Sequence, residues 1–174
     1  MKSILTQQQI SLTIKRLANQ LLETHAVSET VFIGIQPRGI FLSDRLIREL
    51  EIESHASVQY GKLDITFYRD DIRKELHLPN KTDIRFSIEG KKVVLIDDVL
   101  YTGRTIRAAM DALMDFGRPE KVELLVLIDR RYSRELPVQA DYIGKSIDSI
   151  ISQKVKVLWQ ENEGRDDVVL LDES

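Results

Sequence analysis

The sequence predicts an α/β protein with a doubly wound, mostly parallel β-sheet that is flanked by helices. Short apolar runs rich in β-branched residues alternate along the chain with longer segments of helical periodicity. The clearest run, residues 93–96, contains no polar side chain, as expected for a strand that is covered on both faces. The length of 174 residues fits one domain with a substantial core. Strands that alternate with helices in this way form parallel sheets through right-handed crossovers.

The expected elements follow one another in a simple order. A helix begins after Thr6, because Gln9 three residues later completes a capping box, and its apolar stripe ends near Thr24. Residues 31–35 are expected to form a buried strand, and residues 40–50 the helix after it. Further strands are expected at 58–68, 93–96, 122–128, 142–143 and 155–159, with a helix from Gly103 onward and a loop at 130–136.

Composition narrows the function classes. The chain has no cysteine, which removes disulfides and thiolate metal sites. It shows no apolar run long enough to span a membrane and no signal-peptide pattern, so we expect a cytoplasmic protein. The net charge of −3 argues against nucleic-acid binding by bulk charge but leaves a local basic face possible. His25, His55 and His77 have no metal-ligand spacing and are expected on the surface.

The segment 91–105 carries the strongest functional signal. A buried strand is followed by Asp97 and Asp98, at the carboxyl end where open α/β sheets bind their ligands. A turn then opens a helix whose first N–H groups can bind phosphate. The residues of this turn are Tyr101, Thr102, Gly103, Arg104 and Thr105. An acid pair that binds a diol beside a phosphate site is what a ribose 5-phosphate requires, although an acidic turn without a ligand is the alternative for the pair taken alone.

The apolar run, Asp-Asp and Thr-Gly-x-Thr resemble the phosphoribosyl pyrophosphate (PRPP) signature of type I phosphoribosyltransferases. Segments elsewhere resemble one branch, the PyrR family of pyrimidine-operon regulators, whose members are also uracil phosphoribosyltransferases. These segments are residues 63–71, 109–113, 117–119 and 134–137. The resemblance extends from about Leu5 to about Leu171. It implies the type I phosphoribosyltransferase fold as a single domain over 1–174, with a flexible lid hairpin at about 69–87 and a small base hood at about 130–160.

The resemblance implies that uracil and PRPP are converted to UMP and diphosphate. Asp97 and Asp98 would accept hydrogen bonds from the ribose hydroxyls, and their charge would favour a cationic ring in the transition state. Arg69 of the lid would meet the pyrophosphate, and the turn 101–105 would hold the 5′-phosphate. Mg²⁺ is expected to arrive with PRPP, near Asp97 and Asp98 but without dedicated protein ligands.

A second turn takes the place of the family's pyrophosphate loop. It consists of Gln36, Pro37, Arg38 and Gly39 and follows the strand 31–35. Many relatives carry Lys-Thr where this chain has Gln36-Pro37, so one positive charge and one N–H donor are missing. A plain strand-to-helix turn is the alternative interpretation of the spacing.

The base pocket is the least determined part of the site. Asp129 is expected to border it, and backbone groups of Tyr142 and Ile143 would read the uracil edge, with a short core strand as the alternative for this segment. Tyr101 stands where relatives that use 6-oxopurines often carry an acid, which favours a pyrimidine. Many relatives have a shorter Gly-His sequence where this chain has residues 131–133.

Members of the family also bind leader mRNA of the pyrimidine operon, with UMP or UTP as corepressor. Basic candidates for this contact are Lys15, Arg16, Arg130, Arg131, Arg134 and Lys145. Gln139 and Asn19 replace an arginine and a histidine of many relatives. Two alternatives to an enzyme that also regulates therefore stay open: a regulator that senses PRPP or UMP, or binds RNA, with little catalysis, and a purine phosphoribosyltransferase. The family implies a homodimer or homotetramer.

Overall fold

The computed structural model of the chain describes residues 1–70, 81–149 and 152–172. Within these residues a five-stranded sheet has the order β3-β2-β4-β5-β6, and every neighbouring pair is parallel. Its strands are β2 (Thr30–Ile35), β3 (Gln59–Leu63), β4 (Lys92–Leu100), β5 (Lys121–Arg131) and β6 (Tyr142–Asp148). The doubly wound parallel sheet predicted from the sequence is therefore confirmed.

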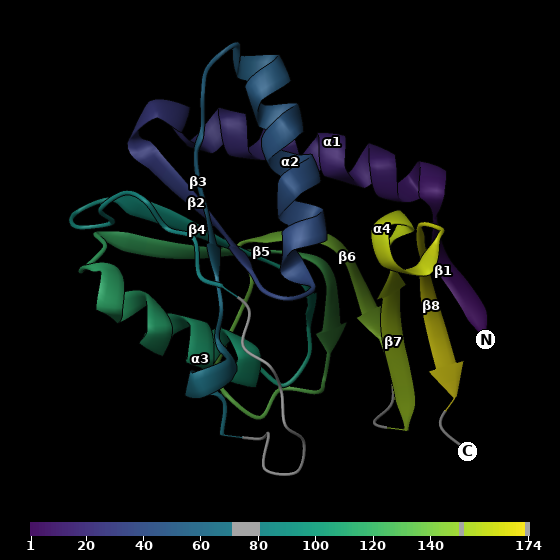
Figure 1. Cartoon of the computed structure of the whole chain (residues 1–174). Coiled ribbons are helices and arrows are strands. Elements are labelled where there is room, and N and C mark those ends of the chain that lie inside the picture. Colours follow the sequence, from purple (N-terminus) through teal and green to yellow (C-terminus); the bar gives the residue numbers. More distant parts are fainter. Residues whose placement is uncertain (71–80, 150–151, 173–174) are drawn as a thin grey trace.

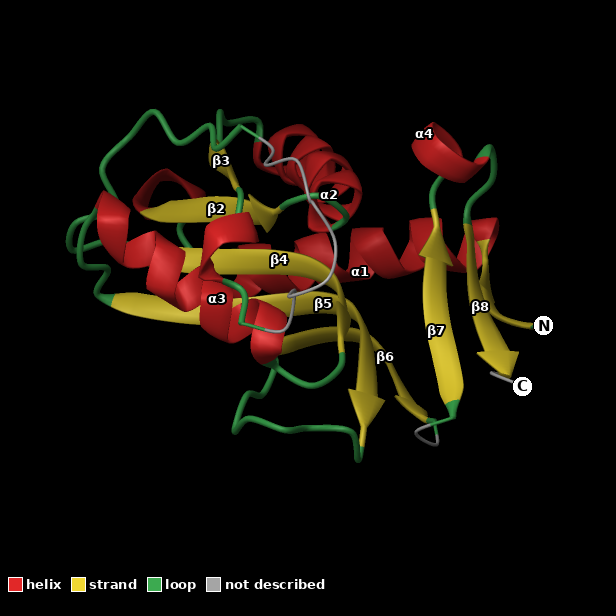
Figure 2. Cartoon of the chain, turned by 60° about the horizontal axis from the view of Figure 1, so that its bottom comes forward, coloured by secondary structure: helices red, strands yellow, loops and turns green. Residues whose placement is uncertain are grey.

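Helices cover both faces of this sheet. Figure 1 shows α1 (Gln7–Thr24) and α2 (Gly39–Ser54) on one side and α3 (Arg104–Leu113) on the other, and the view in Figure 2 agrees. Each face has its own apolar core, one shared by α1 and α2 and one centred on α3. None of the described helices is both long and apolar enough to cross a membrane.

The first helix begins as the sequence predicts. Thr6 Oγ1 accepts a hydrogen bond from the Gln9 N–H at 3.4 Å, and Gln9 Oε1 accepts one from the Thr6 N–H at 2.9 Å. This reciprocal capping box satisfies two N–H groups that an uncapped helix would leave without partners. The apolar stripe of the helix is buried against the sheet, and its buried residues are Ile10, Ile14, Leu17, Ala18 and Leu21.

A second, antiparallel sheet lies beside the first and was only partly predicted. Its order is β1 (Lys2–Thr6), β8 (Asp167–Asp172) and β7 (Gln153–Leu158), with the short helix α4 (Gln160–Glu163) between β7 and β8. Figure 1 shows α4 near one end of α2. Only the strand near residues 155–159 was expected. No local pattern reveals that Lys2–Thr6 pairs with Asp167–Asp172, because the two strands come from opposite parts of the chain.

Three element boundaries differ from the prediction. The strand expected at 58–68 ends at Leu63, because Asp64 Oδ1 accepts from the Thr66 N–H at 3.1 Å and the chain turns into a 3₁₀ segment at Thr66–Tyr68. Strand β4 continues through Asp97 and Asp98, so the acid pair lies within the strand and not after it. Strand β5 extends to Arg131, into the expected loop. Two further 3₁₀ segments, Val27–Glu29 and Met114–Phe116, complete the described helical elements.

Candidate functional site

The site forms at the point where the sheet changes winding direction. Strand β2 has β3 on one side and β4 on the other, so the carboxyl ends of β2 and β4 flank a topological switch point. Open α/β sheets bind ligands at such points. Gly39, which follows β2, lies directly against β4: a Cβ atom there would come within 2.7 Å of the Ile96 carbonyl oxygen and 3.1 Å of Asp97 Oδ1. Only glycine permits this approach.

Asp97 and Asp98 are buried at this switch point, with exposed fractions of 6% and 7%. Burial raises the pKa of Asp97 well above the ordinary value, and the neighbouring Asp98 carboxylate raises it further, while the charge of Arg69 acts in the opposite direction. Burial also raises the pKa of Asp98, against the effect of Arg38. Two adjacent buried carboxylates with raised pKa values are typical of a functional site.

The turn after β4 has the geometry predicted for a phosphate site. Gly103 adopts a φ of 93° and directly precedes α3, and Thr102 Oγ1 accepts from the Arg104 N–H at 3.3 Å. The N–H groups at the start of α3 face this turn. A cavity of about 280 Å³ opens here, and all five predicted residues of the turn line it: Tyr101, Thr102, Gly103, Arg104 and Thr105.

Arg69 lines the same cavity, so the structure brings the predicted lid residue to the phosphate turn. The neighbouring backbone is fixed to α3, since Arg107 Nη2 donates to the Tyr68 carbonyl oxygen at 3.0 Å. Arg104 forms ion pairs with Asp70 at 3.4 Å and with Glu135 at 2.6 Å. Most of the lid predicted at 69–87 lies outside the described residues. The chain returns at 81–87, where Asp83 pairs with Lys62 of β3.

The predicted pyrophosphate turn also lies at the acid pair. Arg38 Nε is 3.4 Å from Asp98 Oδ2. The Gln36–Pro37 peptide bond is cis, and the Gln36 side chain donates to the Lys81 carbonyl oxygen at 2.6 Å. Arg38 has a further partner that sequence reasoning missed: both of its terminal nitrogens lie 3.3 Å from Glu163 Oε1. Nothing in the sequence connects two residues so far apart in the chain.

Two arginines beside the site, Arg130 and Arg134, make contacts within the protein. Arg134 contacts the Asp129 carboxylate and donates to the carbonyl oxygens of Tyr101 at 2.7 Å and Arg130 at 3.0 Å, which joins the phosphate turn to the end of β5. Arg130 is 4% exposed, and its guanidinium lies 3.9 Å from the centre of the Tyr101 ring. The expectation that Arg130 belongs to an exposed basic face is therefore wrong, and Arg134 uses its donors on the protein itself.

Tyr142 and Ile143 form the start of β6, which is the strand interpretation of this segment. The Tyr142 hydroxyl lies 2.9 Å from the Thr24 hydroxyl and 3.0 Å from His25 Nε2, so its side chain points toward the end of α1 and not toward the acid pair. The Ile143 carbonyl oxygen accepts from Arg16 at 3.3 Å. The structure thus brings Asp129 to the phosphate turn through Arg134, whereas the backbone of Tyr142 and Ile143 pairs with Leu125 and Val126, away from Asp129.

His25 is not the surface residue that the sequence led us to expect. Its side chain is 5% exposed, and Nε2 lies 2.6 Å from Glu123 Oε2. The Tyr142 hydroxyl and Thr30 Oγ1 complete its surroundings. This cluster joins the end of α1 to the beginning of β5 and is separate from the acid pair. A histidine just after a helix gives no sign in the sequence of such a buried partner.

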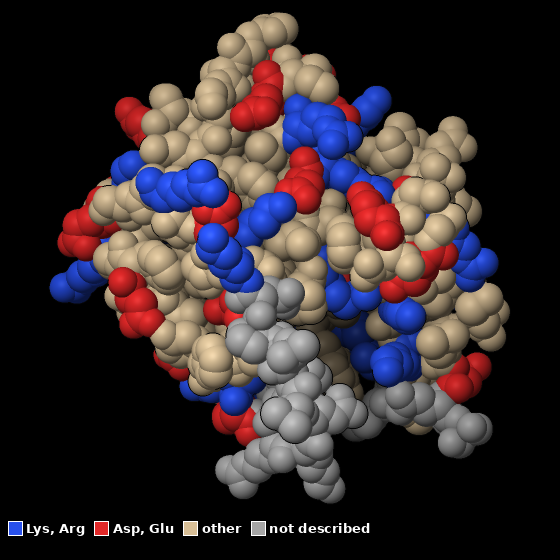
Figure 3. Space-filling model, viewed as in Figure 1, with Lys and Arg blue, Asp and Glu red and all other residues tan. Residues whose placement is uncertain are grey.

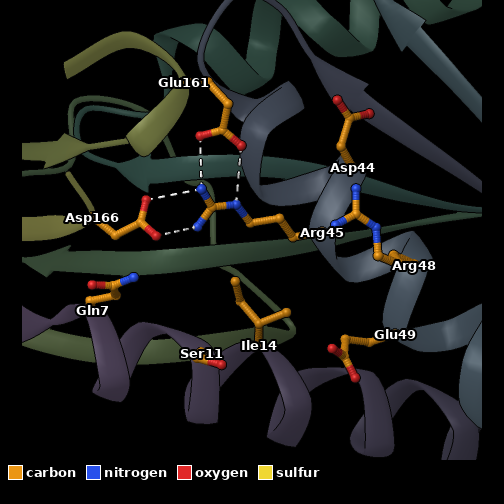
Figure 4. Close-up of a pocket in the computed structure, with 9 residues that line it drawn as sticks. All are labelled: Gln7, Ser11, Ile14, Asp44, Arg45, Arg48, Glu49, Glu161 and Asp166. Carbon is orange, nitrogen blue, oxygen red and sulfur yellow. Dashed lines mark hydrogen bonds and ion pairs between the residues drawn. The ribbon is translucent and has the colours of Figure 1, made fainter. Parts of the chain in front are cut away.

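A larger cavity of about 580 Å³ lies between α1, α2 and the α4 region (Figure 4). Arg45 crosses it and pairs with Glu161 at 2.7 Å and with Asp166 at 2.9 Å. The guanidinium also lies 4.8 Å from the centre of the buried Trp159 ring. On the face seen in Figure 3, Lys and Arg side chains are interspersed with Asp and Glu.

Comparison with known proteins places this site in a family. The phosphoribosyl transferase domain family matches residues 1–162, so this chain has the domain of that class of proteins. The chain is 46% identical over 170 residues to the bifunctional protein PyrR of Nostoc punctiforme, covering 97% of this chain and 95% of the relative. It is 45% identical over 162 residues to that of Enterococcus faecalis, covering 90% and 89%. The chain belongs to the PyrR family.

Solved structures of phosphoribosyltransferases share the fold. The hypoxanthine phosphoribosyltransferase of Staphylococcus aureus is 25% identical with a TM-score of 0.68, covering 86% of this chain and 80% of that one. That of Trypanosoma cruzi has a TM-score of 0.73 at 21% identity, covering 98% and 90%. At such identity the second likeness concerns the fold alone. It confirms the type I phosphoribosyltransferase fold implied by the sequence.

Proposed function

We propose that this protein is a uracil phosphoribosyltransferase that converts uracil and PRPP to UMP and diphosphate, and that it also regulates pyrimidine-operon mRNA in response to pyrimidine nucleotides. Membership of the PyrR family, whose relatives are named bifunctional, supports both roles. The single observation that carries the enzymatic role is the position of Asp97 and Asp98: they are buried at the switch point between two turns suited to bind anions.

The acid pair acts by electrostatics. With the 5′-phosphate in the turn 101–105, the ribose hydroxyls lie toward Asp97 and Asp98, which accept their hydrogen bonds. During transfer the bond from the ribose C1 to diphosphate breaks, and a bond from C1 to N1 of uracil forms as the N1 proton leaves. The ring carbon is positive in the transition state, and two buried carboxylates stabilise that charge without moving.

Mg²⁺ fits this donor set. Asp97 and Asp98 offer hard oxygen atoms of the kind that Mg²⁺ prefers, and both side chains are buried at the switch point. We propose that Mg²⁺ arrives with PRPP and lies near the pair. When bound, the ion neutralises the diphosphate and makes it a better leaving group. Arg38 and Arg69 supply positive charge on the same side of the ribose.

The base lies beyond the acid pair, next to the end of β5. We propose that Asp129, held by Arg134, borders the base, and that the Tyr101–Arg130 stack closes the neighbouring wall. Tyr142 and Ile143 lie in the adjacent strand, where they pair with Leu125 and Val126 and not with Asp129. A tyrosine at 101 offers no carboxylate to a purine ring, which favours uracil as the acceptor.

The regulatory role requires a basic surface for RNA phosphates. Lys15 and Arg16 lie on α1, and Arg16 donates to the Gly144 carbonyl oxygen at 2.5 Å, so this part of α1 lies beside Lys145. We propose that Lys15, Arg16 and Lys145 contact the RNA, in a homodimer or homotetramer. Binding of a labelled leader hairpin should weaken steeply with salt, and sedimentation of the pure protein would give the assembly size.

The enzymatic role is tested by diphosphate release with PRPP and Mg²⁺, using uracil, hypoxanthine, guanine and orotate in separate reactions. We expect turnover with uracil. Turnover with a purine in its place would overturn the base assignment and favour the purine alternative. Binding of UMP without any turnover would favour a sensing regulator.

A further inference from the structure

The second sheet directs a carboxylate toward the pyrophosphate turn. Glu163 is the last residue of α4, and its Oε2 accepts from the Trp159 N–H at 2.8 Å. Trp159 is completely buried, and its ring packs against Phe41 of α2. The backbone around Glu163 is therefore firmly anchored. The side chain is 20% exposed, and its contacts to the Trp159 N–H and to Arg38 direct it toward the pyrophosphate turn.

Glu163 occupies the edge of Arg38 that a phosphate would use. Its Oε1 lies 3.3 Å from both terminal nitrogens of the Arg38 guanidinium. The Val157 carbonyl oxygen accepts from one of these nitrogens, and Asp98 faces the Nε atom at 3.4 Å. An arginine binds phosphate best when a complete edge of the fork is available. Because carboxylates face Arg38 on both sides, a diphosphate gains this guanidinium only by replacing one of them.

Glu163 is also charged at neutral pH. Burial acts to raise its pKa, but the hydrogen bond from the Trp159 N–H and the charge of Arg38 together hold the pKa below the ordinary value. Its negative charge adds to that of Asp97 and Asp98 on the side from which the anionic diphosphate approaches. Lys156 Nζ, 3.8 Å from Glu163 Oε1, offsets part of this charge, so the main effect of Glu163 on such a ligand is competition for Arg38.

We propose that Glu163 is a positioning residue of the pyrophosphate site, which holds Arg38 in the unliganded protein and releases it when PRPP binds. Glu163 thereby makes the affinity for PRPP lower than the turn 36–39 would otherwise provide. This inference rests on the proposed function, because it assigns the pyrophosphate group of PRPP to Arg38. It concerns a residue outside the signature segments 63–71 and 91–105.

The test compares Glu163→Gln with the matched control Glu161→Gln. Both changes neutralise an acid of α4 that pairs with an arginine of the α2 region, but Glu161 pairs with Arg45 (Figure 4). The readouts are calorimetric binding of inorganic pyrophosphate with Mg²⁺ and the KM values for PRPP and uracil. For Glu163→Gln we expect pyrophosphate to bind on the order of five-fold more tightly, with a lower KM for PRPP. The KM for uracil and the behaviour of Glu161→Gln should stay close to wild type.

Unchanged or weaker pyrophosphate binding in Glu163→Gln would overturn the proposal, as would an equal gain in Glu161→Gln or a failure of every variant to bind pyrophosphate. Repeating Glu163→Gln in an Arg38→Met background shows whether the effect passes through Arg38. The gain should then largely disappear, whereas a persisting gain would show general repulsion and contradict the positioning role. The proposed function fails separately, if wild type binds pyrophosphate but does not turn over uracil.

Discussion

Two arginines near α2 face acids of the α4 region, and they are held very differently. Arg45 makes short pairs with Glu161 at 2.7 Å and with both oxygens of Asp166 at 2.9 Å. Arg38 has longer contacts to its acids, 3.3 Å to Glu163 and 3.4 Å to Asp98, and one of its terminal nitrogens also donates to the Val157 carbonyl oxygen. Short bidentate pairs are strong and specific, whereas long shared contacts exchange readily. The comparison indicates that Arg45 ties α2 to the α4 region, whereas the edge of Arg38 that faces Glu163 can exchange that carboxylate for a ligand.

The largest effect on activity is expected from replacing the acid pair, Asp97 and Asp98, next to Arg38. Replacing Asp97 and Asp98 together by asparagine should reduce turnover with uracil by about 10²- to 10³-fold, because two preorganised charges that stabilise the cationic ribose are lost. Diphosphate release under saturating PRPP measures this loss. Circular dichroism is the control for folding, and near-normal turnover in a folded variant would contradict the role of the pair.

Replacing each of the two arginines in turn by methionine tests whether they differ in function. Arg45→Met leaves the Asp166 carboxylate, whose side chain is 9% exposed, without this partner, and we expect it to lower the free energy of unfolding by about 2 kcal/mol with little change in KM for PRPP. Arg38→Met also removes a partner of the buried Asp98, but unlike Arg45→Met it should raise that KM about ten-fold or more. Urea denaturation and steady-state kinetics on both variants measure the two effects. The comparison would be wrong if both variants lost stability and PRPP affinity alike.

The close approach of the pyrophosphate turn to β4 is sensitive to a single methyl group. In Gly39→Ala the new Cβ would meet the Ile96 carbonyl oxygen at 2.7 Å, so the turn must move away from the acid pair. We expect a loss of about 1–3 kcal/mol in unfolding free energy, together with a higher KM for PRPP. Gly90→Ala is a control for KM alone: nothing lies within 4 Å of its Cβ position, but its φ of 65° strains alanine, so it should lower stability and leave KM unchanged.

The raised pKa of Asp97 predicts a small, pH-dependent change in the free energy of unfolding when this residue is replaced. Because folding raises this pKa, the carboxyl favours the folded state at low pH and loses that contribution as pH rises through the folded pKa. At neutral pH the charged group thus destabilises the fold. Asp97→Asn should therefore be more stable than wild type at pH 7. The gain should shrink toward acidic pH in urea titrations, and a stability loss at pH 7 would contradict the burial argument.

The same pKa direction predicts how activity depends on pH. Turnover needs Asp97 charged, so it should fall on the acid side at a higher pH than for an ordinary aspartate. A pH profile of kcat/KM for PRPP measures this limb in the unliganded enzyme. An acid limb at the position of an ordinary exposed aspartate would contradict the prediction.

The sequence predicts features formed within one segment better than contacts between segments that lie far apart in the chain. The acid pair, the turn 101–105 and the helix after it form one continuous segment, so strand pattern, glycine and helix start identify it together. The pairing of β1 with β8, the contact of Arg38 with Glu163 and the contacts of Arg134 with Asp129 and Tyr101 depend on packing between segments that lie apart in the chain. Propensity and spacing carry no signal for such contacts. The same reason explains why His25, expected on the surface, is buried against Glu123.

The most direct test of the central claim is a competition in one vessel. Wild-type protein is given PRPP and Mg²⁺ with equal concentrations of uracil and hypoxanthine, and the nucleotide products are identified by mass spectrometry. The acid pair beside a pyrimidine-accepting pocket predicts UMP as the product, with formation largely abolished in the Asp97→Asn/Asp98→Asn variant. Formation of the hypoxanthine nucleotide in place of UMP, or UMP formation that does not depend on the acid pair, would contradict the account.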